Sequence, residues 1–145
     1  SKYGNKLSSF GDITYRSGNR EEIEGEGFIG VGGLGILIEG PLGSRFTYIG
    51  SYRMSYLDLI ADAINASGGM PSYGDFQAKL EFRPDIYNTF SLLVVNGKSV
   101  YDRDIDGAIE VGESDHGRLM NDQNTIGLNY KHIWSKRGYT NTSIS

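Results

Sequence analysis

The feature that most constrains the fold is a strict alternation of polar and apolar residues in segments separated by turns. Side chains of a β-strand point alternately to the two faces of a sheet. A segment that alternates in this way therefore places its charges on one face and its apolar residues on the other. Between residues 75 and 83 the polar set is Asp75, Gln77, Lys79, Glu81 and Arg83, and the apolar set is Phe76, Ala78, Leu80 and Phe82.

The same period covers most of the chain and predicts an all-β fold, an antiparallel meander of about seven strands. The 10 tyrosines and 21 glycines are typical of β-proteins, and none of the three prolines interrupts a predicted strand. A short strand is predicted at 12–16. The meander is predicted to contain strands at 24–31, 34–39, 45–56, 72–83, 89–100 and 123–134, with a last one starting at 139.

Short and long connections alternate along the meander. The short ones are at 41–43, 84–88 and 135–138, and the long ones are at about 58–72 and 102–122. The short turns should therefore lie at one end of the sheet and the long loops at the other. Leu57, Ile60, Ala61 and Ile64 have helical spacing, which predicts a helical turn in the first long loop.

Amphipathic strands have two interpretations. A soluble antiparallel sheet turns its apolar face inward, whereas a transmembrane barrel turns that face toward lipid. Strand length, the alternation of loop lengths and the aromatic residues near strand ends (Tyr52, Tyr56, Tyr130 and Trp134) favour the barrel. Because such barrels have an even number of strands, from about eight upward, seven strands predict a fragment of a large transmembrane β-barrel.

Several short strings occur in order in the first part of the chain. They are Tyr3-Gly4-Asn5, Leu7-Ser8-Ser9, Asp12-Ile13, Tyr15-Arg16, Gly18-Asn19, Glu39-Gly40-Pro41-Leu42 and Ser55-Tyr56-Leu57-Asp58-Leu59. Together with residues 73–82 they resemble TonB-dependent outer-membrane receptors of the Bacteroidetes type. Phe10-Gly11 and Met54 depart from that pattern. The likeness covers about 60% of the chain well, and the part after Asn88 only by pattern.

The resemblance implies two regions. Residues 1–23 would be the end of the plug domain and a linker, with the last plug strand at 11–16, and residues 24–145 would be the first, incomplete part of a barrel of about 22 strands. It also implies a polar face turned toward the lumen and the plug. The lumen-facing and plug-facing candidates are Arg53, Asp75, Gln77, Lys79, Glu81 and Arg83.

The resemblance further implies a function. The chain would be a segment of a receptor in the outer membrane of a Gram-negative bacterium that imports a substrate. Its partners would be outer-membrane lipid, the rest of its own barrel and plug, and the TonB energy-coupling protein, which would act through a part upstream of Ser1. The substrate and the residues that contact it are not predicted.

No enzymatic or cofactor-binding pattern is present, so we expect neither catalysis nor a cofactor. The chain has no cysteine, and His116 and His132 have no partner at metal-ligand spacing. The glycine-rich residues 30–35 are followed by β-sequence, which excludes a phosphate-binding loop. The mild net charge of −4 is spread along the chain and gives no nucleic-acid footprint.

The second long loop is acidic between Asp102 and Asp115. Its first residues match the D-x-D-x-D-G start of a calcium loop, and the twelfth position is Glu113. The flanking helices that such a loop needs are not predicted. A solvated loop is favoured and calcium binding is the alternative.

Two other functions stay open. The chain would be a soluble β-sandwich or small-barrel binding module that presents its two long loops, or a structural piece that self-associates through open strand edges. The burial of one set of residues distinguishes the soluble module from the transporter, because only the module would pack them against one another in a dry core. That set is Phe46, Tyr48, Tyr52, Phe76, Leu80 and Phe82.

Overall fold

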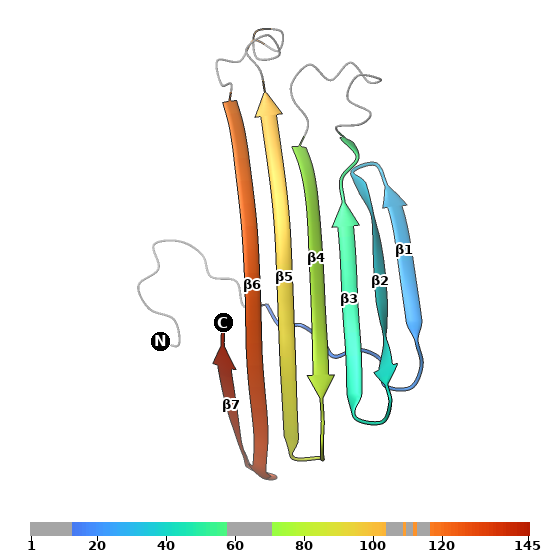
Figure 1. The fold of residues 1–145 in the computed structure, drawn as a ribbon, viewed down its shortest axis with the longest axis vertical. Helices are drawn as coiled ribbons and strands as arrows, with labels where there is room; N and C mark the ends of the chain where they lie inside the picture. Colours follow the sequence, from blue (N-terminus) through green and yellow to red (C-terminus); the bar gives the residue numbers. More distant parts are fainter. Residues whose placement is uncertain (1–12, 58–70, 104–108, 110–111, 113–116) are drawn as a thin grey trace.

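The computed structural model describes residues 13–57, 71–103, 109, 112 and 117–145. They form one sheet of seven antiparallel strands in sequence order (Figure 1). The all-β meander is thereby confirmed, and an open sheet of this kind fits a barrel fragment. The strands are β1 (Glu24–Gly30), β2 (Gly33–Leu42), β3 (Phe46–Met54), β4 (Pro71–Phe82), β5 (Asn88–Arg103), β6 (Gly117–Ser135) and β7 (Gly138–Ile144).

The turns after β2, β4 and β6 lie together at one end of the sheet, which is called the turn end below, whereas the short turn between β1 and β2 lies at the opposite end (Figure 1). Gly43 has a φ of 73°, which suits glycine and closes the turn between β2 and β3. In the turn between β4 and β5, Asp85 accepts hydrogen bonds from the backbone N–H groups of Tyr87 and Asn88, at 2.7 and 2.9 Å. The Asn88 side-chain amide and these backbone groups hold the pKa of Asp85 below its usual range.

The second long loop is shorter than predicted. Strand β5 continues to Arg103 and β6 begins at Gly117, so residues 102–103 and 117–122 are paired rather than looped. Arg118 and Asp122 share a face with Met120, and Leu119 lies on the other face, so the period of two is hidden although the backbone ladder continues. An ion pair at 3.6 Å joins Asp102 to Arg118 across the two strands. The rest of the acidic loop, and all of the predicted helical turn beyond Leu57, lie outside the described residues.

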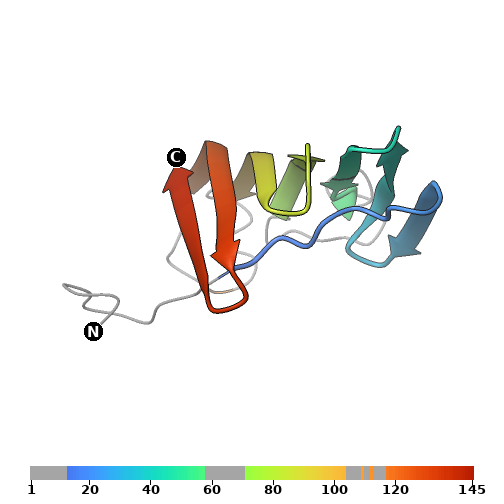
Figure 2. The same cartoon turned by 90° about the horizontal axis from the view of Figure 1, so that it is seen from below.

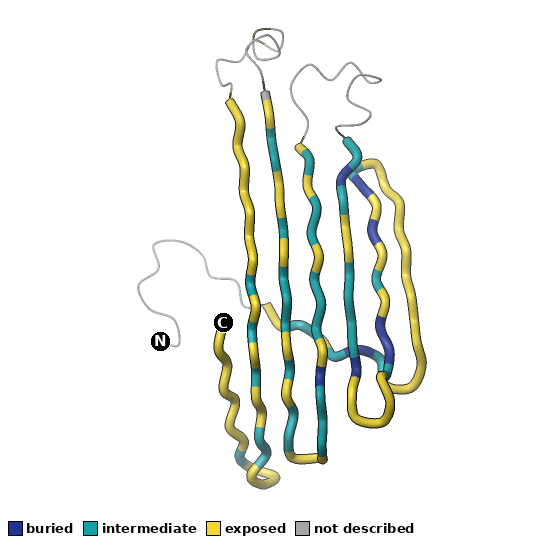
Figure 3. Tube along the Cα trace, viewed as in Figure 1, coloured by how far each residue is buried: buried dark blue, intermediate teal, exposed yellow. Residues whose placement is uncertain are grey.

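The two faces of the sheet differ in an unusual way. On the apolar face most of the large side chains are exposed, and among the described residues no large side chain is fully buried. The buried polar residues are Glu39, Thr47, Ser55 and Glu81, and three of them lie on β2, β3 and β4 (Figure 3). Leu128 and Ile126 on β6 keep 58% and 66% of their surface. The sheet therefore buries carboxylates and exposes hydrocarbon.

No described element covers the apolar face. The strands form a single curved layer, and the described N-terminal residues run along its other side (Figure 2). The six residues expected in a dry core under the soluble interpretation all share the apolar face by their register, and Phe46, Tyr52, Phe76 and Leu80 are exposed. A sandwich would need a second layer, which the described residues do not provide.

Candidate functional site

The candidate site is the polar face of the sheet together with residues 13–23, here called the strap. The strap crosses this face and leads into β1 (Figures 1 and 2). The strand predicted at 12–16 is wrong for its described part, residues 13–16, which carry no strand assignment. The reason is chemical, because the strap's contacts with the sheet are made mainly by side chains. A small hollow between the two is lined by Tyr15, Leu37 and Ile49.

Glu39 on β2 is the first anchor of the strap. Both oxygens of its carboxylate accept hydrogen bonds from the Arg16 guanidinium, a bidentate pair. The backbone N–H of Asn19 donates to the same carboxylate at 2.8 Å. The side chain of Glu39 is only 6% exposed, so the charge is held almost entirely by the strap. An ionised carboxylate removed from water needs such partners.

Glu81 on β4 is the second anchor. The Ser17 hydroxyl donates to Oε2 at 2.6 Å, and the Arg20 guanidinium donates to Oε1 at 3.1 Å. From the sheet, Arg83 Nε lies 2.7 Å from Oε1 and Lys79 Nζ lies 3.8 Å from Oε2. Three cations and a hydroxyl therefore surround one buried carboxylate.

Backbone contacts bring the strap close to the sheet between these anchors. Lys79 Nζ donates to the carbonyl oxygen of Tyr15 at 2.8 Å. Gly18 is buried against β3, and a Cβ at this position would overlap the carbonyl oxygen of Tyr48. Glycine is therefore the residue that permits the strap to lie at this distance.

The six predicted polar-face residues fall into two groups. Arg53, Asp75 and Gln77 form one cluster, with Arg53 Nη2 3.0 Å from Asp75 Oδ2 and Gln77 Nε2 donating to Asp75 Oδ1 at 3.0 Å. Gln77 also lines the small hollow under the strap. Lys79 and Arg83 lie beside Glu81, the second anchor. Sequence reasoning did not include Glu39 among the candidates. The available signal was that Glu39, at an odd position, falls on the other face of the strand from Ile36 and Ile38. For the strap, the available signal was the pair of basic residues Arg16 and Arg20.

A continuous row of rings crosses the apolar face near the turn end. Phe46 stacks on Phe82 with ring centroids 4.4 Å apart, and Phe90 stacks on Tyr130 at 4.6 Å. The row has polar tips, since Tyr130 donates to Asn88 Oδ1 and the Trp134 indole donates to Thr140 Oγ1, each at 2.7 Å. Its members, here called the aromatic row, are Phe46, Phe82, Phe90, Tyr130, His132 and Trp134.

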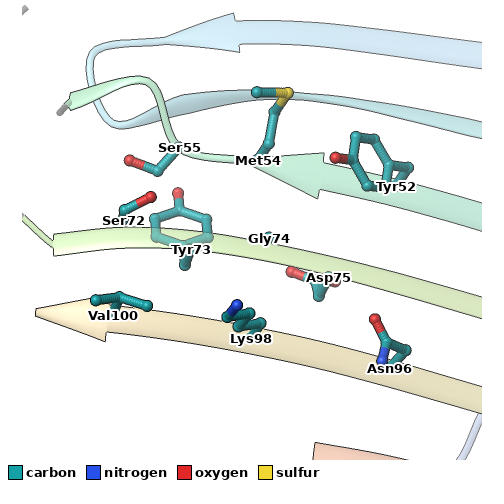
Figure 4. A pocket seen from close by; sticks show the side chains of 10 residues that line it. All are labelled: Tyr52, Met54, Ser55, Ser72, Tyr73, Gly74, Asp75, Asn96, Lys98 and Val100. Carbon is teal, nitrogen blue, oxygen red and sulfur yellow. The ribbon is translucent and has the colours of Figure 1, made fainter. Parts of the chain in front are cut away.

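The apolar face becomes polar toward the other end of the sheet. On β5 and β6 the pair Val94↔Ile126 is followed on the same face by Asn96↔Asn124 and then Lys98↔Asp122. Here a hollow of about 510 Å³ opens where Gly74 lacks a side chain, between Tyr52 and Lys98 (Figure 4). The apolar band thus has a ring-lined border at the turn end and an amide- and charge-lined border at the other.

Within the described residues no group of three or more His, Asp or Glu side chains is placed to hold a metal ion. The expected calcium loop is not covered by that statement, because residues 104–108 and 113–116 lie outside the described part. The described residues also contain no helix long and apolar enough to cross a membrane.

Comparison with known proteins adds no relative. No protein-family model, no curated protein and no solved structure matches the chain. The resemblance to TonB-dependent receptors therefore stays a prediction based on short strings, and the functional argument depends on the geometry of the two faces.

Proposed function

We propose that the chain is a segment of a TonB-dependent type outer-membrane transporter, forming part of the barrel wall and the end of the plug. The observation that carries this proposal is the inverted sheet, with the carboxylates of Glu39 and Glu81 buried under the strap and the opposite apolar face uncovered. In water such a continuous apolar face is disfavoured, because monomeric soluble proteins rarely expose apolar patches of more than a few hundred Å². Hydrocarbon would remove that cost.

The border residues support a membrane setting. On β6 the apolar-face residues run from Ile126 to Trp134, about 26 Å along the strand at about 3.3 Å per residue. At a tilt of about 40° this is about 20 Å of height, close to the apolar band of about 25 Å in outer-membrane barrels. The aromatic row lies at one border, where amphipathic rings are favoured at a membrane interface.

The edges of the sheet fit a larger barrel. In the described sheet β1 and β7 are each paired on one side only. Unpaired backbone groups are costly in lipid, so in a barrel both edges would pair with further strands. The open edges also keep self-association through β1 or β7 as an outcome that a measurement of oligomeric state would reveal.

In this proposal the polar face lines a wet interior and the strap joins the plug to the wall. Import would require the plug to open a path while the strap holds its end against β2, β3 and β4. The energy-coupling partner would act on residues upstream of this chain. The role is transport and not catalysis.

The proposal is tested by expressing the complete gene in a Gram-negative host and fractionating the membranes. A barrel protein is recovered in the outer-membrane fraction and migrates differently on a gel before and after boiling. Recovery as a water-soluble monomer with unchanged migration would contradict the proposal and favour the binding module.

A further inference from the structure

A second feature of the polar face lies at the turn end, below the strap. It is a hollow of about 880 Å³, within the range of ligand sites in proteins. Five cations and two carboxylates line it, a net charge of +3 in a chain whose net charge is −4. The charged residues are Arg20, Arg45, Lys79, Arg83, Lys131, Glu81 and Asp85.

The register places hydrogen-bond donors in one transverse row along this hollow. Lys131 on β6 pairs with Thr89 on β5 and with Asn141 on β7. Arg83 donates its backbone N–H to the Arg45 carbonyl at 2.8 Å, so these two residues lie opposite each other, next to the Phe46↔Phe82 pair. Neighbouring strands are about 4.8 Å apart, so adjacent members are within reach of one small ligand. This donor row is Arg45, Arg83, Thr89, Lys131 and Asn141.

The charges of the row are incompletely neutralised. Glu81 compensates Arg83, but among the described residues neither Arg45 nor Lys131 has a carboxylate partner, and Lys131 Nζ lies 5.0 Å from the centroid of the Tyr139 ring. Like charges directly opposite on neighbouring strands, as in Arg45 and Arg83, are destabilising. The Asn141 Oδ1 accepts from Asn129 at 2.8 Å, which leaves the Asn141 amide nitrogen as a donor.

We propose that the donor row binds an oxyanion, the phosphate or carboxylate group of a small solute, in this hollow. An oxyanion would accept hydrogen bonds from two arginines and a lysine and would remove the repulsion between Arg45 and Arg83. Charge-assisted bonds of this kind are about twice as strong as neutral ones. The inference goes beyond the transporter proposal, because it needs only that the polar face is in contact with water.

The test is a calorimetric titration of the complete gene product, folded in detergent micelles, with sodium phosphate. A titration with sodium chloride of equal ionic strength is the reference. Saturable phosphate binding is expected. Arg45→Gln and Lys131→Gln should each weaken it about tenfold or more, as loss of a charged hydrogen bond predicts. The matched control is Lys98→Gln, which removes the same charge from the opposite face and should change binding less than about twofold.

A second readout separates a site from general attraction. Without phosphate, Arg45→Gln should melt at the same temperature as the wild type or higher, because it removes the like-charge contact. At a phosphate concentration near the wild-type Kd, phosphate should raise the melting temperature of the wild type and of Lys98→Gln clearly more than that of Arg45→Gln. Wild-type protein with no saturable binding, or equal weakening in all three variants, would overturn the site. Neither result would affect membrane localisation, so the transporter proposal is tested separately.

Discussion

At the scale of single residues, Glu39 and Glu81 decide whether the strap stays on the sheet. Each residue is buried and accepts hydrogen bonds from the strap: from Arg16 and Asn19 for Glu39, and from Ser17 and Arg20 for Glu81. A buried charge that loses its partners is costly, so the strap and the two carboxylates stabilise each other. The strap arginines are also sites for trypsin, which makes the contact measurable.

Glu39→Gln should release the strap near Arg16. The amide keeps the shape but loses the charge and cannot accept the bidentate pair, so the bound strap should lose about 1–3 kcal/mol. The rate of tryptic cleavage after Arg16 should rise at least about fivefold, because 1.4 kcal/mol corresponds to a factor of ten. Asp75→Asn is the control, since it breaks an ion pair with Arg53 on the same face without touching the strap. Equal cleavage in both variants would contradict the anchor role.

Gly18→Val should displace the strap by steric overlap with Tyr48. Overpacking of a close contact costs about 1–3 kcal/mol, and the effect should appear as faster cleavage after Arg16 and Arg20. Gly25→Val on β1 is the matched control, because a Cβ there would lie 3.7 Å from the Leu37 carbonyl oxygen, an ordinary van der Waals contact. A Gly18→Val protein as resistant to trypsin as the control would show that the strap does not lie this close.

The turn between β4 and β5 should loosen in acid. The pKa of Asp85 is lowered in the folded turn by its bonds to Asn88 and Tyr87, so its contribution is complete above the unfolded pKa of about 4. That contribution is lost as the pH falls through the lower folded pKa. Protection of the Tyr87 and Asn88 amides, that is, their exchange rate relative to the intrinsic rate at the same pH, should therefore weaken below pH 4 in the wild type and be weak at all pH values in Asp85→Ala. Wild-type protection that stays the same across this pH range would count against the capping role.

At the scale of elements, β5 places adjacent residues on opposite faces of the sheet. Leu92 is on the apolar face and Ser91 on the polar face, where it lines the hollow at the turn end. A lysine near the middle of a lipid-facing band costs about 2–4 kcal/mol, falling to about 0–1 near its border. Leu92→Lys should therefore destabilise the protein in lipid by that larger amount. Ser91→Lys and Asn96→Lys should cost at most about 1 kcal/mol.

The comparison is made by denaturant unfolding in phospholipid vesicles, with the three lysine variants side by side. A similar cost for Leu92→Lys and Ser91→Lys would be incompatible with a lipid-facing apolar side. A large cost for Asn96→Lys would place the border of the band elsewhere.

The aromatic row links neighbouring strands on the apolar face. Phe90 contacts both Phe82 and Tyr130, at centroid distances of 6.1 and 4.6 Å. Aromatic pairs contribute about 0.5–1.5 kcal/mol each beyond their buried area. Phe90→Ala should thus cost about 1–3 kcal/mol more than Leu92→Ala, which truncates the next apolar-face residue of the same strand. Equal costs for the two variants in the same unfolding assay would mean that the row adds no specific stability.

At the scale of the whole molecule, the sequence predicted what is local and missed what is long-range. The period of two placed Arg53 and Asp75 on one face and Phe76 and Leu80 on the other, and the register agrees. It failed beyond Val100 on β5 and before Gln123 on β6, where Asp102, Arg118 and Asp122 share a face with Met120 and the alternation disappears. It also failed for the strap, since the bond from Ser17 to Glu81 spans 64 residues and leaves no local pattern.

The same reasoning explains why the charges were found but not their grouping. Parity placed Lys79, Glu81 and Arg83 together on the polar face, but only the register shows Arg83 beside Arg45 and the donor row beyond it. The faces could be predicted from residue order alone. The partners of those faces depend on tertiary contacts that residue order does not contain.

The central claim is that the apolar face of this sheet meets hydrocarbon while the polar face meets water. Spin labels on single cysteines at positions 89–96 test it most directly, in the complete gene product in lipid vesicles with any cysteine outside these 145 residues replaced; residues 1–145 contain none. The account predicts that oxygen collides preferentially with labels at 90, 92 and 94 and a water-soluble nickel complex with labels at 89, 91, 93 and 95, with the preference reversing at 96. Labels at 90, 92 and 94 that are shielded from both reagents, as in a sealed core, would contradict it.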